Sequence, residues 1–311
     1  MPKKIAMVFP GQGSQSMGML SGFSNTIIQE TFQEASEILS YDLWDIIQNN
    51  INNKLNQTEI TQPALLTASI ALWRLWLDQN GVRPVVMAGH SLGEYSALVC
   101  SEALSFSDAV KLVSQRGKLM QEAVPEDQGT MAAIVGLSLE QLDEICETAS
   151  EGEIVSTANI NSPGQIVIAG HTGAVDRAMS LSKEKGAKLV KKLDVSVPSH
   201  CALMNTASEK LSVLLNNSDI KIPKIAVIHN ADTDIRKDVA GIRQVLSRQL
   251  FSPVRWVESI EKIVKNYAVE IIIECGPGKV LSGLNKRIVN IQTLSLSEPV
   301  LFEEALISCL T

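Results

Sequence analysis

The pattern Gly-x-Ser-x-Gly at residues 89–93 constrains the fold of this chain more than any other feature of its sequence. Glycines lie two residues to either side of Ser91. The apolar run 85–88 predicts the end of a buried strand, and residues 95–100 predict a helix. This order favours a nucleophile elbow, in which small neighbours let a strained turn lift the serine hydroxyl out of the backbone. A glycine-serine turn that only caps a helix is the alternative, but the flanking signals favour Ser91 as a nucleophile.

Two backbone N–H groups are candidates for an oxyanion hole. The Leu92 N–H lies at the start of the predicted helix, where it has no partner inside the helix and faces the place where an oxyanion would form. The first predicted strand, 5–9, ends in a Gly-rich loop that contains Gln12. Because loops at the carboxyl ends of strands can converge on one crevice, we expect the Gln12 N–H to face the same oxyanion. A dinucleotide site is disfavoured, since the third glycine is misplaced and no ribose-binding acid follows a second strand.

Composition argues against several classes of function. The chain has 311 residues, 45% of them hydrophobic, and a formal net charge of -7 at pH 7. This charge and the lack of a basic arm argue against nucleic-acid binding. No apolar run approaches the roughly 20 residues that span a membrane, and the start of the chain leads straight into a strand. We therefore expect a cytoplasmic protein with no membrane segment and no signal peptide.

The cysteines predict neither disulfides nor a metal site. They are odd in number, far apart and without a Cys-x-x-Cys pair: Cys100, Cys146, Cys201, Cys275 and Cys309. Such spacing is typical of free thiols in a reducing compartment, and we expect no bound metal.

The middle of the chain predicts a second, smaller domain. Strands are predicted at 131–135, 154–158, 165–169 and 187–195, and helices at 138–149 and 173–185. This order is that of a ferredoxin-like unit. We predict that residues 128–196 form such a unit, inserted into a large α/β domain made of residues 1–127 and 197–311. Its last helix and strand carry a cluster of lysines, which are either solvated or attract an acidic partner: Lys183, Lys185, Lys188, Lys191 and Lys192.

In the large domain, helices should cover the strands. The pattern predicts helices at 23–39 and 43–51, an Asn-rich surface loop at 49–56 and a long helix opened by Thr61-Gln62-Pro63. Ser105, with Asp108 three residues later, predicts the start of another helix. We expect the strand 269–274 to be the last core strand, followed by a helix through Ile288.

A serine needs a base to act as a nucleophile at neutral pH, and the chain offers four histidines. His90 adjoins Ser91 on the turn and is expected to point elsewhere, while His171 belongs to the small domain. His200 lies where the chain returns to the large domain, and clefts between domains are common places for chemistry. Position favours His200 and leaves His229, at the end of a strand, as the second candidate.

Arg116 lies on the helix that follows Ser105, one turn before Met120. A single arginine on a helix is usually a solvated charge. If it points inward, its planar fork suits a substrate carboxylate.

Six segments carry information beyond these patterns. They are Phe9 to Gln15, Gly89 to Tyr95, Gln115-Arg116-Gly117, Val197 to His200, Ser252 to Trp256 and Glu274 to Gly278. Together, and in this order, they resemble the malonyl-CoA:acyl-carrier-protein transacylase family over essentially the whole chain. The resemblance implies an α/β-hydrolase-like large domain with an inserted ferredoxin-like small domain, in agreement with the patterns above.

The resemblance also implies roles for the catalytic residues. Ser91 would be acylated, and His200 would be its general base and acid. The backbone carbonyl at Gln249 would orient the imidazole, so that the site would be a dyad and not a triad.

Further residues would form the rest of the site by the same resemblance. Gln12 and Leu92 would supply the oxyanion-hole N–H groups, and Arg116 would bind the malonyl carboxylate. Asn159 and Met120 match pocket-lining positions more loosely.

The implied reaction moves a malonyl group from malonyl-CoA to the phosphopantetheine thiol of acyl carrier protein, through a malonyl-serine intermediate. The partners would be coenzyme A thioesters and acyl carrier protein, with no further cofactor, in fatty acid biosynthesis. Three alternatives stay open: a serine thioesterase or esterase, a trans-acting acyltransferase of polyketide synthesis, and a carrier-docking scaffold with a dead site.

Overall fold

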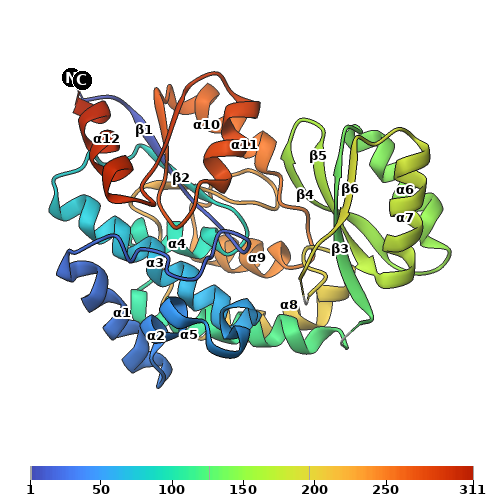
Figure 1. Cartoon of the computed structure of the whole chain (residues 1–311), viewed down its shortest axis with the longest axis horizontal. Coiled ribbons are helices and arrows are strands. Elements are labelled where there is room, and N and C mark those ends of the chain that lie inside the picture. The colour runs from blue at the N-terminus through green and yellow to red at the C-terminus, as the bar shows by residue number, and fades with distance from the viewer. Residues whose placement is uncertain (1, 126, 196, 311) are drawn as a thin grey trace.

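The computed structural model describes residues 2–125, 127–195 and 197–310, which form two separate β-sheets with their helices (Figure 1). The larger sheet has the strand order β7-β2-β1-β8-β9, made of Ala226–Ile228, Val86–Gly89, Ile5–Phe9, Ile271–Glu274 and Gln292–Ser295. The smaller sheet has the order β4-β5-β3-β6, made of Val155–Ser162, Gln165–His171, Gly129–Val135 and Leu189–Lys192. The predicted α/β class with a large and a small part is confirmed.

Helices surround both sheets. Those of the larger part are α1 (Thr26–Leu39), α2 (Leu43–Asn49), α3 (Thr58–Asp78), α4 (Gly93–Cys100), α5 (Phe106–Ala123), α8 (Asn205–Asn216), α9 (Val239–Gln249), α10 (Trp256–Tyr267), α11 (Val280–Ile288) and α12 (Pro299–Leu310). Two short 3₁₀ helices, η1 (Ile51–Asn56) and η2 (Ala202–Met204), belong to the same part. The smaller part carries α6 (Leu139–Ser150) and α7 (Thr172–Glu184).

The larger sheet is parallel, and its central strands β2, β1 and β8 are buried on both faces. Every residue of β1 is buried, with Ile5, Met7 and Phe9 in one apolar cluster and Ala6 and Val8 in another. Apolar runs of this kind are typical of central parallel strands covered by helices. Because Phe9 of β1 pairs with Gly89 of β2, the two strands end at the same edge, and the loops that follow them lie side by side.

The smaller sheet is antiparallel and lies at one side of the molecule (Figure 1). Its strand order and chain order are those of a ferredoxin-like unit. Helices α6 and α7 pack against Ala132 and Ile134 on one face, while Met131 and Ala169 on the other face contact Cys201 of the larger part. The predicted boundaries at 127/128 and 196/197 stay predictions, and residue 196 lies outside the described residues.

The structure corrects one local prediction, the start of the long helix, and adds detail to two others. The Asn-rich stretch 49–56 contains η1, in which Asn52 and Asn53 have φ of 57° and 60°, a conformation that asparagine tolerates. Helix α3 begins at Thr58, because the Ile60 and Thr61 N–H groups already bond to the Gln57 carbonyl; the proline at position 63 therefore lies inside the helix.

The predicted last core strand, 269–274, is β8, and the sheet continues beyond it by one edge strand that was not predicted. Strand β9 pairs with β8 in parallel and adds an edge, and α12 follows it. Its sequence, Gln-Thr-Leu-Ser, alternates in burial and lacks the apolar run that marks a central strand. In the part of the chain that the structure describes, no helix is both long and apolar enough to cross a membrane.

Candidate active site

Ser91 occupies a strained turn between β2 and α4. Its φ is 51°, in the left-handed region that non-glycine residues seldom adopt. A Cβ added at Gly89 would lie 1.9 Å from the Gly93 carbonyl carbon, and one at Gly93 would lie 2.0 Å from the Phe9 oxygen. Both positions therefore require glycine, because the backbone approaches too closely for any side chain. The strain at Ser91 is a reason to look for function there.

Asn230 holds this turn in place from the neighbouring strand. Its Oδ1 accepts a hydrogen bond from the Ser91 N–H at 2.7 Å, and its Nδ2 donates to the Gly89 carbonyl at 2.6 Å. Asn230 follows β7, which pairs with β2 in parallel, so it reaches the turn from the same edge of the sheet. One buried side chain thus fixes both sides of the elbow.

His200 lies beside Ser91 with its ring in a defined tautomer. Its Nε2 is 2.8 Å from Ser91 Oγ, and its Nδ1 is 2.8 Å from the Gln249 carbonyl oxygen. Because a carbonyl can only accept, Nδ1 carries the proton and Nε2 is left to accept the serine proton. The backbone N–H of His200 also donates to the Leu250 carbonyl at 2.9 Å. This hydrogen bond stabilises the unusual backbone conformation of His200, whose φ is 64°.

The orienting carbonyl belongs to a helix end. Gln249 is the last residue of α9, and the last carbonyls of a helix have no partner inside it. They also form the negative end of the helix dipole, which favours a positive charge on an imidazole nearby. A helix C-terminus therefore stands where a serine-histidine-aspartate triad has its carboxylate.

Burial sets the protonation state of His200. The residue is 3% exposed, and desolvation, followed by the positive charge of Arg116, lowers the pKa of His200 to about 3. The hydrogen bond to the Gln249 carbonyl opposes this shift. At neutral pH the imidazole is consequently neutral, which is the form that removes a proton.

Arg116 points inward from α5 and is fully buried. Its Nη1 donates to Gln62 Oε1 at 2.9 Å, and its Nη2 donates to Gln249 Oε1 at 3.0 Å and to Ser91 Oγ at 3.4 Å. Desolvation lowers the pKa of Arg116. Among the described residues no carboxylate forms an ion pair with this guanidinium, so a buried cation next to the serine keeps its capacity for an anion.

A cavity of about 190 Å³ opens over Ser91 and His200. Its lining includes Gln12 from the loop after β1 and Asn159 from β4, so both parts of the molecule contribute to it. Within the described ranges, the N–H groups of Gln12 and Leu92 donate no hydrogen bond. The loop of Gln12 approaches the elbow closely, since a Cβ at position 11 would lie 2.4 Å from the His90 oxygen. Both N–H groups are thus left for a ligand.

Of the two residues predicted to line the pocket, Asn159 lines the cavity and Met120 does not. Asn159 is on β4, and the neighbouring backbone bonds to Val254 from both sides, at 2.9 Å each, which ties the small sheet to the larger part beside the cavity. Met120 is 1% exposed, and its Sδ accepts a hydrogen bond from Gln62 Nε2 at 3.4 Å. Met120 therefore supports the partner of Arg116 and is not among the residues that line the cavity.

The other three histidines are held elsewhere. His229 Nδ1 pairs with Glu94 Oε1 at 2.7 Å, with both side chains fully buried. His90 Nε2 lies 2.8 Å from Asn161 Oδ1 of the small sheet, and burial lowers its pKa. His171 Nδ1 accepts the Ile154 N–H at 2.9 Å. His200 alone of the four hydrogen-bonds the hydroxyl of Ser91.

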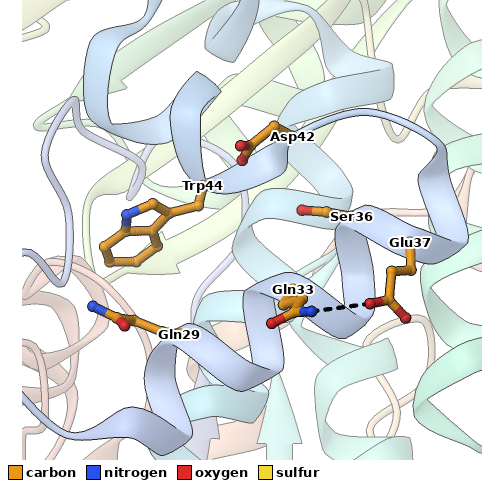
Figure 2. A pocket seen from close by; sticks show the side chains of 6 residues that line it. All are labelled: Gln29, Gln33, Ser36, Glu37, Asp42 and Trp44. Atoms are coloured by element: carbon orange, nitrogen blue, oxygen red, sulfur yellow. Dashed lines mark hydrogen bonds between the residues drawn. The ribbon is translucent and has the colours of Figure 1, made fainter.

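A larger hollow, of about 570 Å³, lies between α1 and α2, away from Ser91 (Figure 2). Its only hydroxyl, on Ser36, donates to the Phe32 carbonyl at 2.7 Å and accepts the Leu43 N–H at 3.0 Å, which are structural contacts. Gln33 Nε2 donates to Glu37 Oε1 at 3.1 Å, as the dashed line shows. The hollow offers no nucleophile with a base. The described part of the chain also holds no group of three or more His, Cys, Asp or Glu side chains arranged to bind a metal ion.

Sequence reasoning missed Gln62, Glu94 and Asn230. Asn230 follows a strand at the catalytic edge of the sheet, and that position could have identified it. Glu94 directly follows the elbow motif, but its burial and its partners His229 and Gln249, which are more than 130 residues away, were not evident from its neighbours in sequence. The direction of Gln62 depends on how α3 packs on α5, which no local pattern reveals.

The fold and this geometry define an α/β protein with the parts of a serine acyl-transfer site. Residues 6–286 match the family model described as acyl transferase domain. The chain belongs to this acyl transferase family.

Particular relatives make the likeness more specific and confirm the resemblance stated from the sequence. A malonyl CoA-acyl carrier protein transacylase from Salmonella typhimurium is 53% identical over 306 residues, which cover 97% of this chain and 99% of that protein. The solved structure of a malonyl CoA-acyl carrier protein transacylase from Coxiella burnetii has a TM-score of 0.98 and 48% identity, covering 100% of this chain and 99% of the other. A type II polyketide synthase acyl-carrier protein in complex with its malonyl-transacylase contains a chain that is 49% identical, with a TM-score of 0.96 and coverage of 98% and 99%.

Proposed function

We propose that this chain transfers a malonyl group from malonyl-CoA to the phosphopantetheine thiol of acyl carrier protein, through a malonyl ester on Ser91. The observation that carries the proposal is the contact of Ser91 Oγ with two groups, His200 Nε2 at 2.8 Å and Arg116 Nη2 at 3.4 Å. The first activates a nucleophile, and the second is a cation placed for an acyl group that ends in a carboxylate. The relatives described above carry this activity in their names, and one solved neighbour is bound to an acyl-carrier protein.

In the first half-reaction, His200 Nε2 removes the proton of Ser91 as Oγ attacks the thioester carbonyl carbon of malonyl-CoA. The oxyanion that forms is stabilised by the free N–H groups of Gln12 and Leu92. The C–S bond then breaks, the imidazolium of His200 gives its proton to the sulfur, and coenzyme A leaves as the thiol. The Gln249 carbonyl stabilises the imidazolium in between.

In the second half-reaction, the thiol of acyl carrier protein gives its proton to His200 and attacks the serine ester. The ester C–O bond breaks, and Ser91 takes the proton back. Water competes with the thiol for the ester, so shelter of the intermediate decides between transfer and hydrolysis. A small cavity, of about 190 Å³ over Ser91 and His200, fits this requirement.

The proposal also covers the cofactor requirement, the pathway and the cellular location. Serine, histidine and backbone N–H groups supply the nucleophile, the base and the oxyanion hole, so we propose that the reaction uses no cofactor beyond its thioester substrates. We propose fatty acid biosynthesis as the pathway and the cytoplasm as the location, and a role in polyketide synthesis is the alternative, since one neighbour serves that system.

Incubation with labelled malonyl-CoA, with and without holo acyl carrier protein, tests the proposal. We expect a malonyl adduct on the wild-type chain by intact-mass spectrometry and transfer of the label to the carrier protein. The Ser91→Ala variant should carry no adduct. Rapid release of free malonate without transfer would identify a thioesterase, and no adduct at all would identify a scaffold with a dead site.

A further inference from the structure

A buried carboxylate behind the elbow has no part in the mechanism above. Glu94 is fully buried, and it lies outside the lining of the cavity. Its Oε1 pairs with His229 Nδ1 at 2.7 Å, while its Oε2 accepts hydrogen bonds from the Asn230 N–H at 2.9 Å and from Gln249 Nε2 at 2.8 Å. Burial of a carboxylate costs free energy unless such partners surround it. The contacts of Glu94 therefore indicate what its role is.

Gln249 connects this carboxylate to the cavity. Its side-chain Oε1 accepts a hydrogen bond from Arg116 Nη2 at 3.0 Å, and its Nε2 donates to the Ser91 carbonyl at 2.9 Å as well as to Glu94. These partners fix the direction of the amide, because a guanidinium can only donate and a carbonyl can only accept. A reversed amide would face the guanidinium with a donor and Glu94 with an acceptor.

From these contacts we propose that Glu94 is a positioning residue for Arg116 and so determines the preference for acyl groups that end in a carboxylate. Glu94 fixes the amide of Gln249, and the amide oxygen holds the nitrogen of Arg116 that lies beside Ser91 Oγ. The inference rests on the proposed function, in which Arg116 binds the malonyl carboxylate.

The indirect connection matters for charge. A carboxylate in direct contact with Arg116 would neutralise it and compete with the carboxylate of the substrate. With a neutral amide between them, Glu94 orients the guanidinium and leaves its charge available to a ligand. The position of the Arg116 guanidinium is thus fixed through Gln249, while none of the described carboxylates contacts the guanidinium directly.

The decisive measurement is the ratio of acylation rates with malonyl-CoA and acetyl-CoA, from single-turnover quench experiments read by intact mass. Glu94→Met has a side chain of similar length and removes the acceptor for Gln249. We expect the malonyl-to-acetyl ratio to fall at least about 10-fold, as the loss of one hydrogen bond to a charged group implies. A role that is only structural would slow both substrates equally and leave the ratio unchanged.

Glu94→Gln is the rescue variant. The Asn230 N–H requires an acceptor at the position of Oε2, so the new amide places its oxygen there and still accepts from Gln249. We expect a ratio within about 3-fold of wild type, well inside the loss expected from one hydrogen bond. A fall as large as in Glu94→Met would overturn the proposal in favour of an effect of the charge alone.

Glu274 offers a matched control. It is also a fully buried carboxylate, at the end of β8, and its oxygens accept the N–H groups of Leu281 and Ser282 at 3.0 Å and 2.7 Å. Glu274→Met should lower thermal stability and leave the malonyl-to-acetyl ratio at the wild-type value. A changed ratio there would show that the ratio reports general damage, which would overturn the inference drawn from Glu94→Met.

Two further variants keep the proposal falsifiable. If Glu94→Met does not fold, Glu94→Asp keeps the charge and withdraws the acceptor from Gln249 by one methylene, and we expect the ratio to fall at least about 3-fold. In the background of Arg116→Met, changes at position 94 should no longer alter the ratio, because the residue acts through Arg116. An unchanged ratio in both Glu94→Met and Glu94→Asp would refute the inference but not the function, whereas a wild-type protein that forms no malonyl adduct would refute the function.

Discussion

The two sides of the serine elbow each hold a buried histidine, and the two differ in what they face. On the cavity side, His200 has a backbone carbonyl on one nitrogen and the hydroxyl of Ser91 on the other. On the far side, His229 has a carboxylate partner, and its Nε2 has no hydrogen-bond partner among the described residues. The acid-histidine pair that resembles a triad is therefore the one without a nucleophile. Contact with the hydroxyl, and not the presence of an acid, identifies the base.

The comparison also shows two uses of burial. On the cavity side, burial keeps His200 neutral, and the described hydrogen-bond partners of the buried Arg116 are all uncharged, so both residues are ready for a substrate. On the far side, donors surround the carboxylate of Glu94, and the result is a rigid support. Replacement of the two histidines should consequently change different quantities, the acylation rate for His200 and the stability for His229.

The largest effect should follow removal of the base. His200→Ala should slow acylation of Ser91 by about 10³-fold, because general base catalysis contributes about 10²- to 10⁴-fold. Single-turnover formation of the malonyl adduct measures the rate. A similar loss in His229→Ala, with His200→Ala near wild type, would reverse the assignment of the two histidines.

The cation on the cavity side should affect substrates selectively. Arg116→Met should lower acylation by malonyl-CoA by about 10²-fold, the equivalent of a charge-assisted pair, and leave acylation by acetyl-CoA unchanged or faster. The rates are measured side by side with the two thioesters. Equal losses with both would assign Arg116 a structural role.

On the far side, the expected change is in stability. His229→Asn should lower the free energy of unfolding by about 3 kcal/mol, since it leaves a buried carboxylate with one partner fewer. Denaturant unfolding measures this, with acylation as the second readout, and the rate should fall far less than in His200→Ala. If His229→Asn were as stable as wild type but no longer acylated Ser91, His229 would have a catalytic role like that of His200.

The last prediction concerns the dependence of stability on pH. The pKa of His200 is lowered from 6.5 to about 3 in the folded protein, so below pH 6.5 the unfolded chain binds a proton that the folded protein does not. The contribution of His200 to stability is therefore present above pH 6.5 and is lost as the pH falls towards 3, at no more than about 1.4 kcal/mol per pH unit. His200→Gln should unfold with a flatter dependence on pH between 6.5 and 4 than wild type. Parallel curves for the two proteins would show that His200 is protonated alike in both states.

Local sequence was enough for much of the fold and for the central site residue. The glycines around Ser91 are dictated by close backbone contacts, and the capping of α5 by Ser105 is confirmed by a hydrogen bond from the Asp108 N–H at 3.0 Å. The order of strands and helices in residues 129–192 predicted a ferredoxin-like unit because periods of two and of 3.6 residues are local properties. Edge strand β9 escaped prediction because only one of its faces is buried.

By itself, then, the sequence determined that a serine stands on a strained turn after a buried strand, and that a small antiparallel unit lies in the middle of the chain. Only the tertiary structure decided which histidine meets that serine, that Arg116 points inward, and that Glu94 and Gln249 support it from behind. The reason is physical. Turns and periodic faces depend on residues close in sequence. The buried charges of Arg116 and Glu94 are instead placed by partners 25 to 155 residues away, which only the packing of the sheet and its helices brings into contact.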